Sequence, residues 1–365
     1  MKIATLPPFG RTGLLRLCHF KLRHEITMLM IHGVMDHGVP VQWKPLRSQI
    51  DCRQLDSSIR ILSKQYHLAS LEEAVDMVAG RTPVQPHTLV LTFDDGYRNN
   101  LKYALPILQR HGVPATFFIA TGHIEKRKPY WFDRLDFAIQ HADVAGRKFN
   151  IGDKVVSFRS NERNELRQTY KSLRDTAKGI VRSDFEMISE LEDLAALLES
   201  ESGQSLSRIF EDDDWSSLLT WDQVRAASTT GVSFGSHTVD HIRLGLVSDD
   251  IVRDQLLRSK EMIEKHTGRP CRYLCYPSGS FSRRVMEIAR ECGYEAAVTT
   301  IAGTNPIGED LMSLRRIHLP SNGGAFVLFA ALSGLSNLKA RIMNLATRTV
   351  DTKNIYDPDS WITGE

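Results

Sequence analysis

One local pattern, repeated four times along the chain, limits the possible folds more than any other feature of the sequence. In each copy an amphipathic helical stretch is followed by a glycine, and an apolar, β-rich run begins within a few residues. The four glycines are Gly112, Gly231, Gly268 and Gly293. Glycine just past a helix supplies the left-handed conformation that ends it. Helices and strands that alternate in this way predict a wound α/β sheet or a (β/α) barrel.

Seven short runs are predicted as strands because they are rich in apolar and β-branched residues. They lie at 26–33, 88–93, 115–120, 232–237, 272–277, 296–300 and 314–319. Almost continuous hydrophobicity of this kind is typical of parallel strands that are covered on both faces. We therefore expect a parallel sheet with helices packed around it.

Between about Ile124 and Asp222 the pattern breaks, and the chain becomes charged and helix-prone. This segment is too long to be a loop between a strand and a helix. We predict a split barrel at 1–123 and 220–330, a mainly helical inserted subdomain at 124–219, and a C-terminal helix and tail at 331–365. Because insertions usually emerge from loops that carry function, we expect this one to bend over the functional site.

The overall composition excludes some classes of protein. The 46 Lys and Arg residues against 44 Asp and Glu residues leave a net charge of +2, which is too balanced for a nucleic acid as the main partner. The five cysteines are scattered and form no CxxC pair, which favours reduced, packed thiols over a disulfide framework or a zinc ribbon. The number of subunits is not indicated by the sequence.

The sequence printed shows no secretion signal and no membrane-spanning run. The stretch 1–25 contains prolines and charges where a secretion signal needs an unbroken apolar segment. No run reaches the length of about 20 apolar residues that crosses a bilayer. We therefore expect a cytoplasmic protein. The segment 325–345 is apolar and then basic; packing against the barrel or a partner subunit is favoured, and peripheral contact with the inner face of the membrane is the alternative.

Two adjacent aspartates, Asp94 and Asp95, follow the strand predicted at 88–93. Active sites of such folds lie beyond the carboxyl ends of the strands. Gly96 then lets the chain turn, and Asn99 or Asn100 is expected to cap the next helix. Taken alone, the pair is also explained by one carboxylate that caps a turn and another that faces solvent.

A second strand end favours a functional role for this pair. His237 and His241 lie four residues apart at the end of the strand predicted at 232–237. If a helix starts at Thr238, both imidazoles face one point, as two ligands of one metal do. With one of the two aspartates they make a two-histidine, one-carboxylate set. That set suits Zn²⁺, with iron or another transition metal as alternatives, and leaves the other aspartate free to act as a base.

The sequences TFDDG, at 92–96, and SHTVDH, at 236–241, resemble the first two motifs of the polysaccharide deacetylases, the NodB-homology carbohydrate esterases. The resemblance extends over both flanks, from 29–34 to 314–320, and leaves out only the insertion. It implies a deformed (β/α) barrel of about seven parallel strands. It also implies metal-dependent removal of an acetyl group from a sugar, as in deacetylases of the exopolysaccharide or O-antigen type.

The resemblance carries roles to individual residues. Asp94 becomes the general base, and Asp95, His237 and His241 become the ligands of the metal. In the last motif of the family a histidine acts as general acid, and His318 is the nearest candidate here. The alternative for His318 is a structural histidine on a partly buried strand.

The third motif of the family departs from its usual form here. The matching stretch, CYPSGS at 275–280, keeps Pro277 and offers the backbone N–H of Ser278 as an oxyanion donor, but it lacks the arginine of the family. Arg316, or its neighbour Arg315, is predicted to orient Asp94 instead.

Other residues at the same strand ends are predicted to bind substrate. These are His32, Tyr97, Tyr276 and Pro277; for His32, a structural role at the rim is the alternative. Four aromatic residues near the insertion either form a wall for sugar stacking or, as we favour, anchor the subdomain; they are Trp131, Phe132, Trp215 and Trp221.

The resemblance and the missing export signal together suggest the substrate. We expect an acetylated amino sugar in nucleotide-linked, lipid-linked or oligosaccharide form. A deformylase or another amide hydrolase on the same scaffold is the nearest alternative. A carbohydrate-binding protein without activity is the more distant one, and the missing arginine motivates it.

Overall fold

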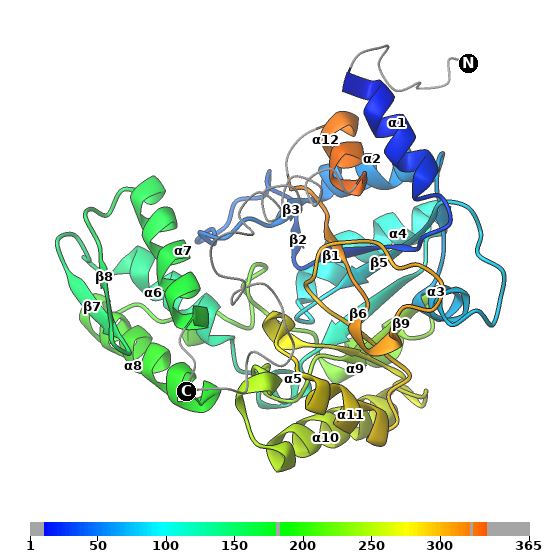
Figure 1. The fold of residues 1–365 in the computed structure, drawn as a ribbon. Coiled ribbons are helices and arrows are strands. Elements are labelled where there is room, and N and C mark those ends of the chain that lie inside the picture. Colours follow the sequence, from blue (N-terminus) through cyan, green and yellow to red (C-terminus); the bar gives the residue numbers. More distant parts are fainter. Residues whose placement is uncertain (1–10, 180–182, 322–323, 334–365) are drawn as a thin grey trace, which may run out of the picture.

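The structure is a computed structural model that describes residues 11–179, 183–321 and 324–333 (Figure 1). Its main sheet has the strand order β11-β10-β9-β6-β5-β1-β12, and all neighbouring strands are parallel. The strands are β1 (Thr27–Ile31), β5 (Thr88–Phe93), β6 (Ala115–Ile119), β9 (Val232–Ser236), β10 (Tyr273–Cys275), β11 (Ala296–Val298) and β12 (Ile317–His318). A short further strand, β4 (His67–Leu68), pairs with β5. Each of the seven predicted runs contains one strand of this sheet.

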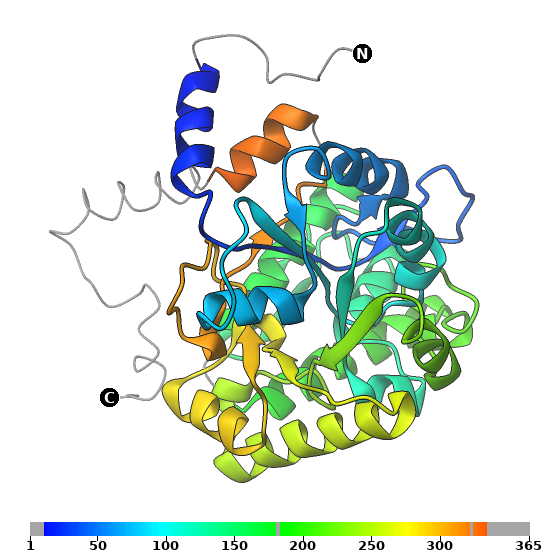
Figure 2. The ribbon, with the colours of Figure 1, turned by 90° about the vertical axis from the view of Figure 1, so that its right-hand side faces the viewer.

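The sheet curls into a deformed barrel, so the predicted fold class is confirmed. Between the two end strands the ladder is reduced to one bridge, Val298 to Leu314. Two backbone hydrogen bonds support this seam, from the N–H of Leu314 to the oxygen of Ala297 (3.0 Å) and from the N–H of Thr299 to the oxygen of Leu314 (2.8 Å). Figure 2 shows the strands at the centre of the molecule with helices around them.

The helices of the barrel are α1 (Arg11–Lys21), α2 (Cys52–Leu62), α3 (Leu71–Val78), α4 (Leu105–His111), α5 (Thr121–Lys126), α9 (Trp221–Ala227), α10 (Asp249–Thr267), α11 (Arg283–Glu291) and α12 (Ala325–Leu332). A π-helix, Asn100–Ala104, precedes α4, and the short strands β2 (Val34–Met35) and β3 (Ile50–Asp51) pair beside the sheet. Neither predicted asparagine cap is present before α4. Asn99 instead binds backbone groups of more distant segments, because its side chain accepts from the N–H of Val34 and donates to the oxygen of Asp214.

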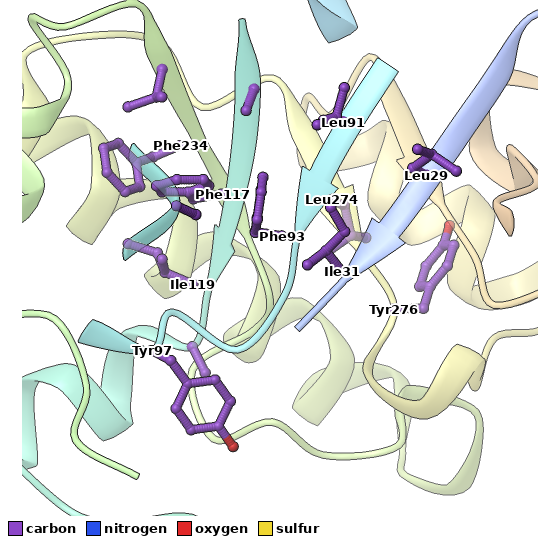
Figure 3. Packing of buried hydrophobic residues seen from close by; sticks show 14 of the residues in the cluster. Leu29, Ile31, Leu91, Phe93, Tyr97, Phe117, Ile119, Phe234, Leu274 and Tyr276 are labelled. Atoms are coloured by element: carbon purple, nitrogen blue, oxygen red, sulfur yellow. The ribbon is translucent and has the colours of Figure 1, made fainter. Parts of the chain in front are cut away.

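Both faces of the strands are buried, as their composition predicts. Alternate residues such as Leu91 and Phe117 pack in one cluster with α2, α4, α9 and α10 (Figure 3). The residues between them, such as Val90 and Phe118, belong to another cluster together with α3. This rigid double layer holds the strand ends, where the predicted chemical groups lie, in fixed positions.

The predicted insertion has a hydrophobic cluster of its own. It contains α6 (Trp131–His141), the antiparallel hairpin of β7 (Lys148–Ile151) and β8 (Lys154–Ser157), α7 (Arg163–Gly179) and α8 (Asp184–Ser202). In Figure 1 these elements stand to one side of the barrel. The end of the insertion returns to the loop after β5, where the N–H of Leu219 donates to the oxygen of Gly96 (3.0 Å). The domain boundaries themselves stay a prediction.

Three further expectations concern the ends of the chain and the thiols. Of the apolar-then-basic segment 325–345, only α12 and Ser333 lie within the described residues, and most of the predicted tail lies outside them. Leu328 and Phe329 of α12 are buried against the barrel cluster. None of the helices in the described part of the chain is long and apolar enough to cross a membrane. All five cysteines are free thiols.

Candidate active site

A cavity of about 400 Å³ opens at the carboxyl ends of the strands, between the barrel and the insertion. It is lined by Met30, His32, Arg47, Asp94, Asp95, Trp131, Phe132, Arg174, Lys178, Asp184, Met187, His237, His241, Arg243, Tyr276, Ser278, Thr300 and His318. Most of the residues singled out in the sequence therefore meet in one place, although they come from distant parts of the chain.

Asp94 follows β5 and is held by a guanidinium group. Arg316 donates from Nη1 to Oδ1 and from Nη2 to Oδ2 of this carboxylate, both at 2.7 Å. The two side chains are almost fully buried, with residue exposures of 2% for Asp94 and 1% for Arg316. Burial alone would raise the pKa of Asp94, but the charge and the hydrogen bonds of Arg316 outweigh it and lower this pKa below its usual value.

Of the two arginines proposed to replace the missing one, only Arg316 reaches Asp94. Arg315 points elsewhere and pairs with Glu309 at 3.3 Å. Arg316 is itself fixed by the backbone oxygen of Thr299 (2.9 Å) and the hydroxyl of Thr92 (2.9 Å). An arginine directly before the last strand, β12, thus binds and orients the first aspartate.

The backbone adopts a left-handed turn directly after Asp94. Asp95 and Gly96 have φ angles of +73° and +71°. Such angles are costly for a residue with a side chain, and the turn is held by the Tyr130 hydroxyl, which donates to the oxygen of Asp95 at 2.6 Å. A Cβ atom at position 96 would lie 3.0 Å from a methyl group of Ile119, so glycine also fits this turn sterically.

The carboxylate of Asp95 lies between two imidazoles. Its Oδ1 is 3.5 Å from Nε2 of His237 and 3.4 Å from Nε2 of His241. The ligand atoms of these three residues lie within 4.8 Å of one another. The Nδ1 atom of His237 is 2.7 Å from the oxygen of Cys275, a contact that favours a proton on Nδ1 and a lone pair on Nε2.

This donor set fits a divalent metal. Two imidazole nitrogens and one carboxylate oxygen are ligands that zinc binds in open, catalytic sites. A second group, Asp94, His237 and Cys275, also converges. It fits a metal less well, because both oxygens of Asp94 already bind Arg316, and the Cys275 sulfur lies 3.1 Å from the same guanidinium.

The histidine pair does not lie on a helix, which corrects the expectation that one starts at Thr238. The segment is a loop in which Thr238 and His241 have φ angles of +65° and +53°. The loop is fixed by the side-chain oxygen of Gln255, which accepts hydrogen bonds from the N–H groups of Val239 and Asp240. The imidazoles converge because of this fixed backbone, not because of helical spacing.

His32 and His318 stack at the open side of the cavity, with ring centroids 6.1 Å apart. Burial lowers the pKa of His32 to about 4. The pKa of His318 is also lowered, first by burial and then by the charge of Arg316. Both imidazoles are therefore mostly neutral at pH 7, and the predicted role of His318 as an acid stays a prediction.

The stretch after β10 forms the floor of the cavity. Ser278 has a φ of +55°, and Gly279 approaches Thr300 so closely that a Cβ atom would lie 2.0 Å from the threonine hydroxyl. The ring of Tyr276 lines the cavity, while its hydroxyl donates to the oxygen of Met312 (3.0 Å). Pro277 is buried and is not among the lining residues.

Tyr97 does not reach the cavity, which corrects its predicted contact with substrate. Figure 3 shows its ring beyond the ends of the strands. It is fully buried, and its hydroxyl donates to Asp133 at 2.7 Å and contacts Arg47. Arg47 also pairs with Asp133 at 2.5 Å. Tyr97 therefore positions a charged pair behind the cavity.

Sequence reasoning missed most of the wall opposite the strands. The insertion contributes Trp131, Phe132, Arg174, Lys178, Asp184 and Met187, and other loops contribute Arg47 and Arg243. Apart from Trp131 and Phe132, which the sequence analysis considered, no motif marks these residues, so no local signal in the sequence identifies them. Of the four aromatic residues considered, only Trp131 and Phe132 line the cavity; Trp215 packs in a separate cluster, and Trp221 stacks on His266.

The fold is a deformed (β/α) barrel that carries a candidate metal site at the ends of its strands. The sequence model of one family, described as polysaccharide deacetylase, matches residues 81–297. The chain belongs to the polysaccharide deacetylase family, which confirms the resemblance seen in its motifs.

Individual relatives are more distant. YxkH of Bacillus subtilis (strain 168), a candidate polysaccharide deacetylase, is 26% identical over 110 residues, which make up 30% of this chain and 39% of that protein. The Streptococcus pyogenes deacetylase PplD, solved in complex with acetate, superposes with a TM-score of 0.54 at 19% identity and covers 84% of this chain and 97% of its own. IcaB from Ammonifex degensii superposes with a TM-score of 0.52 at 16% identity, and the match covers 85% of this chain and 96% of IcaB. At these identities the two structures support the fold.

Proposed function

We propose that the protein removes the N-acetyl group from an amino sugar in a glycan, glycolipid or sugar nucleotide, with the help of a divalent metal, for which Zn²⁺ is the expected ion. The observation that carries the proposal is the convergence of Asp95, His237 and His241 within 4.8 Å beside an aspartate that Arg316 holds at two points. Membership of the polysaccharide deacetylase family supports the reaction class.

Asp95, His237 and His241 would hold the metal. When bound, such an ion lowers the pKa of water and polarises the acetyl carbonyl group. The contact between His237 and the oxygen of Cys275 keeps one imidazole in the orientation that a ligand needs.

Asp94 would act as the base. Its lowered pKa keeps it ionised at neutral pH, and each carboxylate oxygen retains lone-pair capacity beyond the bond from Arg316. The bidentate contact fixes the direction of those lone pairs, so that the carboxylate accepts a proton from water at a set position.

The remaining residues would stabilise the transition state and the leaving group. The N–H of Ser278, on the tight turn after β10, is the proposed donor to the oxyanion. His318, in its protonated form, is the proposed donor of a proton to the departing nitrogen. Trp131 lines the cavity and offers an aromatic ring against which the sugar could rest.

The test is release of acetate from acetamido-sugar oligosaccharides, glycolipids and sugar nucleotides, combined with metal analysis of the purified protein. We expect acetate release that a chelator abolishes and that added Zn²⁺ restores. Formate release from formylated substrates, without acetate release, would favour the deformylase alternative. Binding of acetamido sugars by the metal-loaded protein without any hydrolysis would contradict the proposal and favour a binding protein.

A further inference from the structure

Cationic residues form a stripe along α7. Arg163, Arg167, Arg174 and Lys178 are separated by four, seven and four positions. These spacings place the four side chains on one face of the helix. At the rise of an α-helix the stripe is about 22 Å long.

The stripe connects two cavities. Arg174 and Lys178 line the catalytic cavity. Arg163 and Arg167 line a second cavity of about 270 Å³, and Arg47 lines both. The second cavity is formed by His37, Lys44, Pro45, Leu46, Arg47, Ser48, Gln49, Arg163, Asn164, Arg167, Trp215 and Ser321. This set contains four cationic side chains and no carboxylate; one of the four, Arg47, pairs with Asp133, which lies outside the set.

The carboxylates of the catalytic cavity do not neutralise the stripe. Asp94 pairs with Arg316, and Asp184 pairs with Arg243 at 2.5 Å. Asp95 lies between the two histidines, where its charge complements a bound metal. Within 11–179, 183–321 and 324–333, no carboxylate pairs with any of the four cations of the stripe.

A structural role explains only part of the stripe. Arg163 donates to the backbone oxygens of Lys44 and Pro45, and Arg167 donates to the hydroxyl of Ser48. These bonds tie α7 to the loop before β3, but the acceptors are neutral and leave both positive charges uncompensated. The buried Nε of Arg174 has no hydrogen-bond partner among the described residues. Charges that are retained without counter-charges around a cavity attract anions.

We propose that the substrate is an anionic glycan, in which oxyanions on units next to the acetamido sugar bind the stripe on α7. This inference rests on the proposed deacetylation. Arginine recognises phosphoryl and carboxylate groups with the same paired donors, so the shared chemistry is an oxyanion displaced from the reacting sugar. Arg47, which lines both cavities, marks the path between the reacting sugar and the second cavity.

The experiment compares three acetamido-sugar ligands of matched length: a neutral oligosaccharide, one with uronate units and one with phosphodiester links. The metal-loaded protein is assayed for kcat/KM by acetate release and, independently of turnover, for the Kd of each deacetylated product. We expect an anionic product to bind at least about tenfold more tightly than the neutral one at low salt, with the advantage decreasing as salt increases. Whichever anionic product binds more tightly, the one with uronate units or the one with phosphodiester links, identifies the source of the oxyanion.

Variants link this preference to the stripe. The double variant Arg163→Gln, Arg167→Gln should weaken binding of the anionic product by about tenfold and leave the Kd of the neutral product unchanged. The matched control is Lys171→Gln, because Lys171 lies on the same helix, pairs with Asp175 and lines neither cavity. If the double variant does not fold, the single variants Arg163→Gln and Arg167→Gln provide the same comparison, because both residues line the second cavity and neither lines the catalytic one.

Two results would overturn the inference: equal affinity for neutral and anionic products, or equal weakening of both by the variants. These measurements also distinguish failure of this inference from failure of the proposed deacetylation. Efficient acetate release from the neutral oligosaccharide without any anionic preference would leave the deacetylase standing and remove the anionic substrate. Tight, stripe-dependent binding of anionic products without acetate release from any ligand would support the anion site and contradict the deacetylase.

Discussion

The two walls of the cavity differ in how their charged groups are paired. On the barrel wall, Asp94, Asp95 and His237 are at most 3% exposed, and each has a charged or hydrogen-bonding partner. On the insertion wall, Arg174 and Lys178 have no carboxylate partner among the described residues. Groups fixed in advance favour chemistry, because they need no reorganisation during the reaction. Unpaired groups on an inserted helix favour selection of the substrate.

The two walls are nevertheless attached to each other. Tyr130, within the predicted insertion, donates to the oxygen of Asp95, and Leu219 at its far end donates to Gly96. Removal of the whole segment 124–219 would therefore disturb the turn that places a proposed metal ligand. Point variants separate the two walls more cleanly than a deletion does.

The largest effect is expected at the base. Asp94→Asn should lower kcat by about 10³-fold, because the amide cannot take up the proton from water. Metal content, measured by atomic absorption, should stay the same, since Asp95 and the two histidines remain. Full activity in this variant would exclude Asp94 as the base, whereas loss of metal would place Asp94 among the ligands.

The next largest effect is expected at the guanidinium that faces this base. Arg316→Met should destabilise the fold by about 3–5 kcal/mol, because it leaves a buried carboxylate without its counter-charge. The lowered pKa of Asp94 stabilises the folded state above the usual carboxyl pKa, and this stabilisation is lost as the pH falls toward the folded-state pKa.

Denaturant unfolding of Arg316→Met and wild type across the acidic range checks this prediction. The gap between the two free energies of unfolding should narrow on acidification. Arg315→Met is the matched control, since Arg315 is partly exposed and pairs with Glu309. A gap that does not depend on pH would show that the arginine stabilises the fold by packing alone.

A third effect concerns the metal. His241→Ala removes one of three proposed ligands and should weaken Zn²⁺ binding by at least about 100-fold, with activity partly recovered at excess metal. Competition with a chromophoric chelator measures the affinity. An affinity equal to that of wild type would mean that the ion, if one binds, sits elsewhere.

The smallest effect is expected on the insertion wall. Trp131→Ala should raise KM about fivefold and change kcat little, because a stacking face contributes to binding of both substrate and transition state. Trp221→Ala is the control, since Trp221 stacks on His266 away from the cavity. A large fall in kcat at position 131 would assign this wall to the chemistry and remove the contrast between the two walls.

The contrast also explains how far the sequence alone could lead. Strand runs and the glycines after helices depend on local periodicity, and the Asp94–Asp95 and His237–His241 pairs follow strands, so the fold and the meeting of these four side chains in one cavity were predictable. No helix starts at Thr238, because the side chain of Gln255, on the following helix α10, fixes the backbone of this segment as a loop. Tyr97 and Arg47 meet through Asp133, a contact across the insertion that no local pattern encodes.

Arg316 has one more consequence, which concerns biosynthesis. It lies beside the seam where Val298 and Leu314 join the ends of the sheet, and it bonds Thr92 on β5 and Asp94 directly after β5. A nascent chain that has left the ribosome only as far as α11 already contains Asp94, Asp95, His237 and His241, but it lacks this arginine. Such a chain would hold an unneutralised acidic residue in its interior, so enzymatic competence should appear only after the last strand has docked.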